Sequence, residues 1–154
     1  MDIAVVYGDL LEQPVECIVN AWNTNRIPWW MLIPHGVSGA IKKRGGVKPF
    51  QEIASTGPLP LGYARKTSAG NLPFKAIIHV AAINVFWNAS EASIADSVVS
   101  AMKLAEEAGF SSIAFPILGA GSGRFNPEHA ETIMRQTFEK LDSNIAVTLV
   151  RYKV

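Results

Sequence analysis

The chain alternates short, strongly apolar runs with longer segments in which apolar residues recur at helical spacing. Residues 17–21 form a nearly continuous apolar run, as strands covered on both faces of a sheet do. We predict strands over residues 3–7, 17–21, 63–67, 76–82, 112–118 and 145–152, with residues 63–67 as a candidate edge strand. Strands that alternate with helices predict a three-layer α/β/α sandwich around a mixed, largely parallel central sheet.

Two long helices have recognisable ends in the sequence. Ser90 can cap the first and Gly109 ends it. Its predicted core face consists of Ile94, Val98, Met102 and Ala105. Asn126 followed by Pro127 predicts the start of the second, whose core face consists of Ala130, Ile133, Met134, Phe138 and Leu141. Shorter helices are predicted over residues 36–44 and from Pro49 onward.

Length and charge limit the class of protein. A chain of 154 residues is the length of one domain, residues 1–154, and it can bury enough surface to fold without a disulfide or a metal. Charged residues make up 18% and the net charge is +1, so no overall field attracts nucleic acid or an anionic membrane. Its apolar stretches fall short of the ~20 residues that span a bilayer, and its first residues lack a basic leader. The single cysteine, Cys17, is expected to be a buried thiol, so we predict a cytoplasmic protein.

The clearest candidate site follows the predicted strand 112–118. Residues 119–125 read G-A-G-S-G-R-F, and a capped helix follows them. Three glycines leave the backbone N–H groups unobstructed, and a helix N-terminus adds partial positive charge, so this loop suits a phosphate or diphosphate. A plain strand-to-helix turn is the alternative. A dinucleotide fingerprint needs a glycine at Arg124 and a nucleophile elbow needs glycines on both sides of Ser122, so the sequence argues against a dehydrogenase and a serine hydrolase.

Three other segments carry polar groups at the ends of predicted strands. Residues 34–41, P-H-G-V-S-G-A-I, form a second glycine turn that runs into a helix. The basic run 42–44 beyond it is interpreted as a solvated helix face or as long-range help for an anion. Asn20 and Asn23 are poor strand formers, and we expect one to bond loop backbone and the other to recognise a sugar hydroxyl. Residues 8–10, G-D-L, are a plain turn or place a carboxylate against an amino group.

These segments, in this order, resemble the macro domain family. The motifs that carry the resemblance are the G-D-L turn at 8–10, I-V-N-A-W-N at 18–23, G-V-S-G-A-I at 36–41, N-L-P at 71–73 with I-I-H at 77–79, and residues 112–125. The resemblance implies a module that binds ADP-ribose, a derivative of it, or an ADP-ribosylated protein. The sequence predicts neither a metal site nor a cofactor.

The resemblance also implies a role for each matching residue. Asp9 would accept a hydrogen bond from the adenine amino group with Leu10 beside it, and Tyr152 would pack on adenine. One phosphate would lie against Gly36, Val37 and Ser38, and the diphosphate and distal ribose would lie against Gly119, Ala120, Gly121, Ser122 and Gly123. Asn23 and Phe125 would meet the distal ribose.

Catalysis stays open, because Ser38 stands where hydrolases of this family often carry an aspartate, and no lysine lies in residues 76–82. A phosphate-bound water could still hydrolyse an ADP-ribosyl linkage or ADP-ribose-1''-phosphate while Asn23 positions the sugar. His35 is a speculative acid or base, and the alternative is a structural or solvent-facing histidine.

Residues 24–33, which include Trp29, Trp30 and Met31, are longer than the family usually has between these motifs. They are packing anchors, a lid or a partner surface, and Trp22 could narrow the site or pack against them. Two alternatives to ADP-ribose binding therefore remain. One is a non-catalytic nucleic-acid or poly(ADP-ribose) binder that uses residues 42–44 and the tryptophans. The other is an oligomer surface over residues 29–31.

Overall fold

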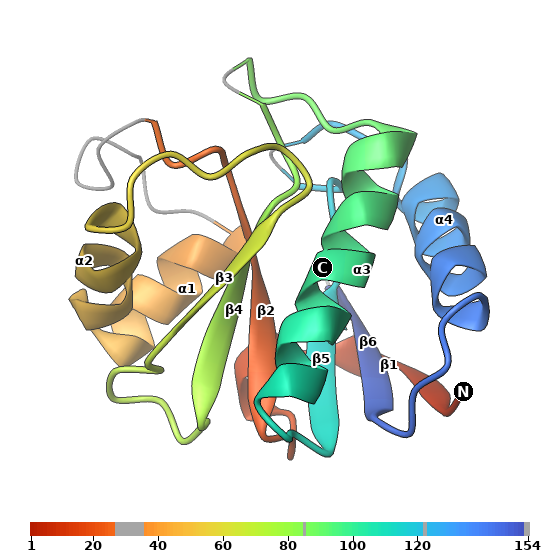
Figure 1. The fold of residues 1–154 in the computed structure, drawn as a ribbon, viewed down its shortest axis with the longest axis horizontal. Helices are drawn as coiled ribbons and strands as arrows, with labels where there is room; N and C mark the ends of the chain where they lie inside the picture. The colour runs from red at the N-terminus through yellow and green to blue at the C-terminus, as the bar shows by residue number, and fades with distance from the viewer. Residues whose placement is uncertain (27–35, 85, 122, 153–154) are drawn as a thin grey trace.

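The computed structural model describes residues 1–26, 36–84, 86–121 and 123–152. Their strands form one sheet in the order β1-β6-β5-β2-β4-β3 (Figure 1). The strands are β1 Ile3–Gly8, β2 Cys17–Trp22, β3 Ala64–Thr67, β4 Ala76–Ala81, β5 Ser112–Pro116 and β6 Ala146–Tyr152. Every pairing is parallel except that of β3 with β4. The predicted mixed, largely parallel sheet with residues 63–67 at its edge is therefore confirmed.

Helices cover both faces of the sheet, which gives the predicted three layers (Figure 1). The helices are α1 Gly36–Gly45, α2 Lys48–Ala54, α3 Glu91–Glu107 and α4 Pro127–Glu139, with a short 3-10 helix, η1, at Leu10–Glu12. Alternate strand residues point to opposite faces, so Val19 and Ile78 pack under α3 and α4, whereas Ile18 and Ile77 pack against α1 and α2. Strands buried on both faces account for the low charged fraction of the chain.

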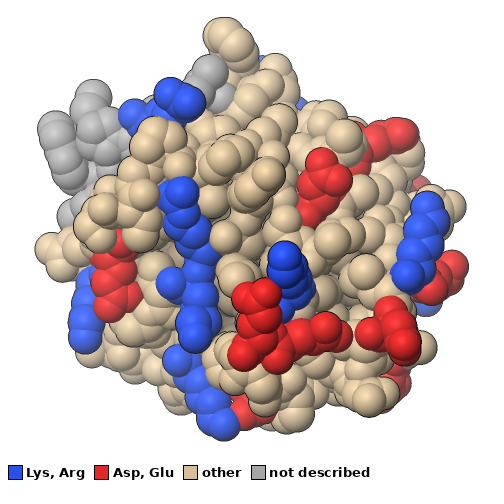
Figure 2. All heavy atoms as spheres, viewed as in Figure 1, with Lys and Arg blue, Asp and Glu red and all other residues tan. Residues whose placement is uncertain are grey.

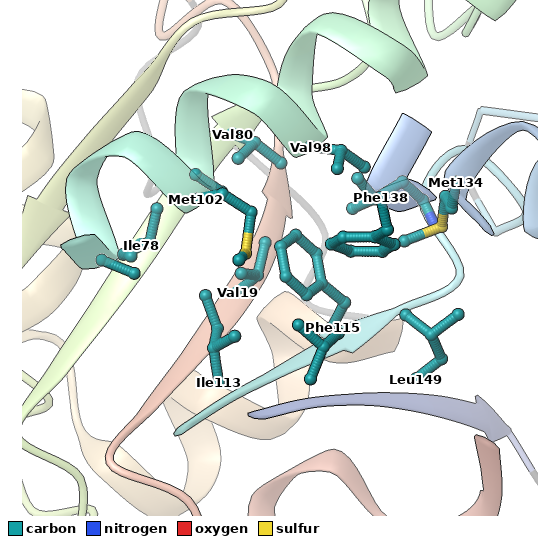
Figure 3. Packing of buried hydrophobic residues seen from close by; sticks show 14 of the residues in the cluster. Val19, Ile78, Val80, Val98, Met102, Ile113, Phe115, Met134, Phe138 and Leu149 are labelled. Carbon is teal, nitrogen blue, oxygen red and sulfur yellow. The ribbon is translucent and has the colours of Figure 1, made fainter. Parts of the chain in front are cut away.

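The larger core lies between the sheet and the pair α3 and α4 (Figure 3). The rings of Phe115 on β5 and Phe138 on α4 meet edge to face there, with their centroids 5.2 Å apart. Cys17 is fully buried, as expected, and its burial raises the pKa of the thiol to about 12. An inert core thiol follows from that environment.

Both long helices begin where the sequence predicts, and α3 also ends there, whereas α4 ends at Glu139, before the predicted core residue Leu141. Ser90 and Ser93 form a reciprocal capping box at the start of α3, and Gly109 follows its end with φ +75°. Asn126 caps α4 by accepting a hydrogen bond from the backbone N–H of His129. Within the described residues, no helix is long and apolar enough to cross a membrane.

Figure 2 shows both basic and acidic side chains on one face of the molecule. On the face shown there, Lys and Arg side chains lie over β3, while Asp and Glu gather toward the C-terminal end of α3. On this face, therefore, no single charge sign dominates.

The order of the strands creates a switch point beside β2. From β2 the chain passes through α1, α2 and β3 to β4 on one side, and α3 then carries it back to β5 on the other side of β2. Ligands of open α/β sheets bind at such a point, outside the carboxyl ends of the strands.

Candidate functional site

A pocket opens at this switch point, at the upper edge of the sheet in Figure 1. It is lined from the ends of β2, β4 and β5 and from the first turns of α1. The described lining residues are Ala21, Trp22, Asn23, Gly36, Val37, Ser38, Lys42, Ile83, Trp87, Pro116, Ile117, Gly119, Gly121 and Gly123. None of them is acidic, and one is a lysine, so the described part of the pocket favours an anion.

The glycine loop after β5 forms one wall of the pocket, and two of its glycines are required by the backbone. Gly119 has φ +79°, and a Cβ built there would lie 2.8 Å from the Cβ of Ala89. A Cβ on Gly123 would lie 2.6 Å from the carbonyl oxygen of Gly119. Gly121 is different, because a Cβ there would meet nothing within 4 Å. The loop is therefore tightly folded at its two ends and open at its centre.

The first turn of α1 forms a second wall of the pocket. Gly36 begins the helix with φ +62°, and Val37 and Ser38 follow it into the pocket lining. The first N–H groups of a helix have no partner within the helix and carry partial positive charge. The predicted pair of amide-bearing loops therefore does line a single pocket.

Asn23 lies at the end of β2 and is 4% exposed. Its side-chain oxygen accepts a hydrogen bond of 2.7 Å from the backbone N–H of Asn25, in a local Asx turn. Asn25 in turn donates to the carbonyl oxygens of Ile53 and Gly57 and so ties the loop to the end of α2. The turn thus holds the side-chain oxygen of Asn23.

Asn20 has a partner of a kind that the sequence did not indicate. It is fully buried, and its amide nitrogen lies 3.1 Å from Nδ1 of His79 in the neighbouring strand β4. The hydroxyl of Ser38 donates to the side-chain oxygen of Asn20 over 2.9 Å. His79 is fully buried too, and this burial lowers its pKa to about 3, so its ring is neutral at pH 7. The predicted bond to loop backbone is therefore made by Asn23, whereas Asn20, the asparagine left for a sugar hydroxyl, bonds buried and half-buried side chains instead.

Asp9, Leu10 and Tyr152 do not line this pocket but lie farther along the same edge of the sheet. Gly8 of β1 pairs with Tyr152 of β6, which brings the three residues together at the ends of these strands. One oxygen of Asp9 accepts a hydrogen bond from the backbone N–H of Leu11, and the other lies 2.6 Å from Arg44. Leu10 is buried in the core, whereas Tyr152 is 82% exposed.

The other predicted residues have different positions. Phe125 is half-buried outside the described pocket lining, and its ring centroid lies 5.1 Å from that of His129. Ala120 is also half-buried and belongs to the glycine loop without lining the described pocket. Ser122, His35 and residues 27–33, with Trp29, Trp30 and Met31, lie outside the described residues.

Lys42 was interpreted as part of a solvated basic face, and for this residue that prediction is wrong. It lines the pocket, and its Nζ lies 4.9 Å from the ring centroid of Phe50 and 5.9 Å from that of Trp22. Desolvation in this position lowers the pKa of Lys42. Its position four residues after Ser38, on the same side of α1, is the sequence signal that could have placed it at the site.

Comparison with known proteins identifies similar sequences and structures. Residues 19–134 match the family model described as Macro domain. A macro domain-containing protein of Caldanaerobacter subterraneus is 31% identical over 158 aligned positions, which cover 97% of this chain and 86% of that protein. An O-acetyl-ADP-ribose deacetylase of Escherichia fergusonii is 33% identical over 127 positions, covering 77% of this chain and 68% of the relative.

Two further matches bear on length and fold. A protein of Aeropyrum pernix is 36% identical over 127 positions, and the aligned part spans 79% of this chain but 62% of the relative. Among solved structures, a mutant macrodomain of Oceanobacillus iheyensis with ADPR superposes with a TM-score of 0.80 at 28% identity. That match covers 96% of this chain and 83% of the other.

Proposed function

This chain belongs to the macro domain family, and on that premise we propose that it binds ADP-ribose or a derivative of it, free or attached to a protein. The observation that carries the proposal is the pocket beside β2. Two sets of backbone amides, from the glycine loop after β5 and from the first turn of α1, line it together with Lys42. Such a site holds a diphosphate through amides and one cation, which suits a chain of net charge +1.

The pocket and the group formed by Asp9, Leu10 and Tyr152 lie along the same edge of the sheet, and they suit the two ends of such a nucleotide. The pocket takes the diphosphate and the distal ribose, with Asn23 donating to that sugar. Asp9, with one oxygen fixed by Leu11 N–H, accepts the adenine amino group, and Tyr152 covers the adenine ring. We further propose that residues 1–154 act as one macro-like domain and that the protein works in the cytoplasm, where a free Cys17 thiol is stable.

Isothermal titration with ADP-ribose tests the proposal. Asp9→Asn keeps an oxygen for Leu11 N–H but replaces the second oxygen, which lies 2.6 Å from Arg44 and would also accept from adenine, with an NH₂ group. We expect its affinity for ADP-ribose to fall about tenfold, the value of a hydrogen bond to a charged group. Glu12→Gln is the matched control, because Glu12 also lies near Arg44, at 3.9 Å, but has no adenine contact in the proposal. Absence of heat with the wild-type protein at millimolar ADP-ribose would contradict the proposed function.

Hydrolysis of an ADP-ribosyl ester is a second candidate function. The observation that favours it is the likeness to a relative named O-acetyl-ADP-ribose deacetylase, together with the buried Asn23 in the pocket. If a phosphate-bound water attacks the acetyl carbonyl carbon while Asn23 holds the sugar, the ester bond breaks and acetate and ADP-ribose form. Asn23→Ala then abolishes this turnover of O-acetyl-ADP-ribose, which chromatography of the products measures. A wild-type protein that binds this ester and leaves it intact is a binding module alone.

A further inference from the structure

A row of buried hydrogen bonds leads from the edge strand β3 to the pocket. The hydroxyl of Thr67 lies 3.0 Å from the carbonyl oxygen of Ser68 and 2.8 Å from Nε2 of His79. From His79 the row continues through Asn20 to the hydroxyl of Ser38, over the distances of 3.1 and 2.9 Å given above. Thr67, His79 and Asn20 are all buried, whereas Ser38 is half-buried and lines the pocket.

Two contacts give the direction of this row. The Thr67 hydroxyl donates to the carbonyl oxygen of Ser68, and Asn20 turns its NH₂ group toward Nδ1 of His79. The Thr67 oxygen must then accept from His79, whose ring therefore carries its proton on Nε2. Nδ1 of His79 becomes an acceptor, and the NH₂ group of Asn20 donates to it.

The same logic sets the proton of Ser38. Because the NH₂ group of Asn20 faces His79, its oxygen faces Ser38 and can only accept. The Ser38 hydroxyl therefore donates its one proton to Asn20, and its oxygen lone pairs can accept from other groups. A second proton on the His79 ring would break this order, and burial opposes that proton because it lowers the pKa of His79 to about 3.

We propose that Thr67, His79 and Asn20 are positioning residues that make Ser38 a pure hydrogen-bond acceptor toward the pocket, so that Ser38 selects a ligand with a sugar hydroxyl there. The proposal rests on the proposed function. A phosphate oxygen only accepts, so it gains nothing from the side chain of Ser38 and is held by backbone N–H groups instead. The distal ribose of ADP-ribose offers hydroxyl donors that ADP lacks. Ser38 thus favours ADP-ribose over ADP.

The tautomer of His79 can be measured without any ligand. Long-range ¹H–¹⁵N NMR correlations of the histidine ring distinguish a proton on Nε2 from one on Nδ1. We expect the Nε2–H form in the wild-type protein. Thr67→Val removes the acceptor of that proton, so we expect the Nδ1–H form with Asn20 turned over, while Thr67→Ser restores the Nε2–H form. A proton on Nδ1 in the wild-type protein overturns the proposal.

Titrations with ADP-ribose and with ADP test the role of Ser38. Ser38→Ala is expected to weaken ADP-ribose binding roughly tenfold and ADP binding less than twofold. Thr67→Val, remote from the ligand, is expected to weaken ADP-ribose binding roughly threefold, because the turned hydroxyl keeps one lone pair, and Thr67→Ser restores it. Thr132→Val is the matched control, since this exposed threonine on α4 donates only to its own helix, at Glu128.

Each outcome decides one of the two proposals. If Ser38→Ala weakens both nucleotides equally, Ser38 donates to a phosphate, and if it weakens neither, Ser38 does not meet the ligand; both results overturn the inference. If the wild-type protein binds ADP but not ADP-ribose, the preference assigned to Ser38 is wrong. If it binds neither, the proposed function itself fails. The NMR measurement still decides whether His79 carries its proton on Nε2 and so whether Asn20 donates to it.

Discussion

At the scale of single residues, Ser97 stands out, because its buried hydroxyl has no hydrogen-bond partner among the described residues. Burying a hydroxyl without a partner costs free energy, and alanine is also the better helix former in α3. We therefore expect Ser97→Ala to raise the free energy of unfolding by about 1 kcal/mol, measured by urea denaturation.

Ser100, one turn further along α3, is the matched control. Its hydroxyl donates to the carbonyl oxygen of Gly62 over 2.7 Å, so Ser100→Ala should lower the free energy of unfolding by about 1 kcal/mol. If both variants change stability in the same direction, burial without a partner is not what distinguishes Ser97.

Residues whose roles depend on chain neighbours were predictable, and those whose roles depend on distant partners were not. Ser90 and Asn126 cap helices through groups three positions away, and the sequence predicts both. His79 meets Asn20 across 59 positions, and no local pattern indicates that pairing. Lys42 was misinterpreted because a basic run on a helix does not reveal which aromatic rings lie beneath it.

At the scale of elements, the glycine loop after β5 has positions that differ in how well they tolerate an added side chain. Gly123→Ala places a Cβ 2.6 Å from the Gly119 carbonyl oxygen and 2.9 Å from Ile83, so we expect a loss of about 2 kcal/mol in stability and weaker ADP-ribose binding. Gly121→Ala meets open space, so thermal denaturation should show a change within about 0.5 kcal/mol. A strongly destabilised Gly121→Ala would contradict this picture of the loop.

The elements themselves were largely predictable, because their apolar periods are clear. Strands and helices begin and end within about two residues of their predicted bounds, and the core positions of α3 and α4 are buried as expected, with Leu141 only partly so. The sequence did not predict the order of the strands, since strands with similar apolar runs can pair in many orders. That order brings Asn23, Ser38 and Gly119 to one pocket and leaves Asp9 beside Tyr152.

At the scale of the whole molecule, buried His79 couples stability to pH. Its pKa is about 3 in the folded protein and near 6.5 in the unfolded chain. Below pH 6.5 the unfolded chain therefore binds a proton that the folded protein does not, so the free energy of unfolding falls as pH falls, until about pH 3. Between pH 6 and 5 we expect a slope of about 1.2 kcal/mol per pH unit from this group.

Urea denaturation at pH 7, 6 and 5 checks this dependence. His79→Gln should be less stable at pH 7 but should lose most of the slope, whereas His129→Gln, a change at an exposed histidine, should keep it. Glu16, whose pKa is lowered from 4.5 to about 2 by hydrogen bonds from Lys75 and Ser111, loses its contribution to stability mainly below this range. A slope that persists in His79→Gln would assign the effect to another group.

The described residues bear on the nucleic-acid alternative at this scale, while its Trp29 and Trp30 lie outside them. Of its basic run, Lys42 lies over two aromatic rings and Arg44 pairs with Asp9. Trp22 is buried, and Trp87 is half-buried in the pocket lining. A long polyanion needs a continuous basic surface, and the face in Figure 2 carries both signs of charge. A small anionic nucleotide needs only the pocket.

The pairing of β1 with β6 has a consequence for the order of events during synthesis. Arg151 of β6 follows Tyr7 of β1 by 144 positions, so at the usual pace of translation β1 waits roughly ten seconds or more for the strand beside it. Strands β2, β4 and β5, which frame the pocket, emerge earlier. The adenine end of the proposed site, which needs both β1 and β6, is therefore the last part of the site whose residues are all synthesised.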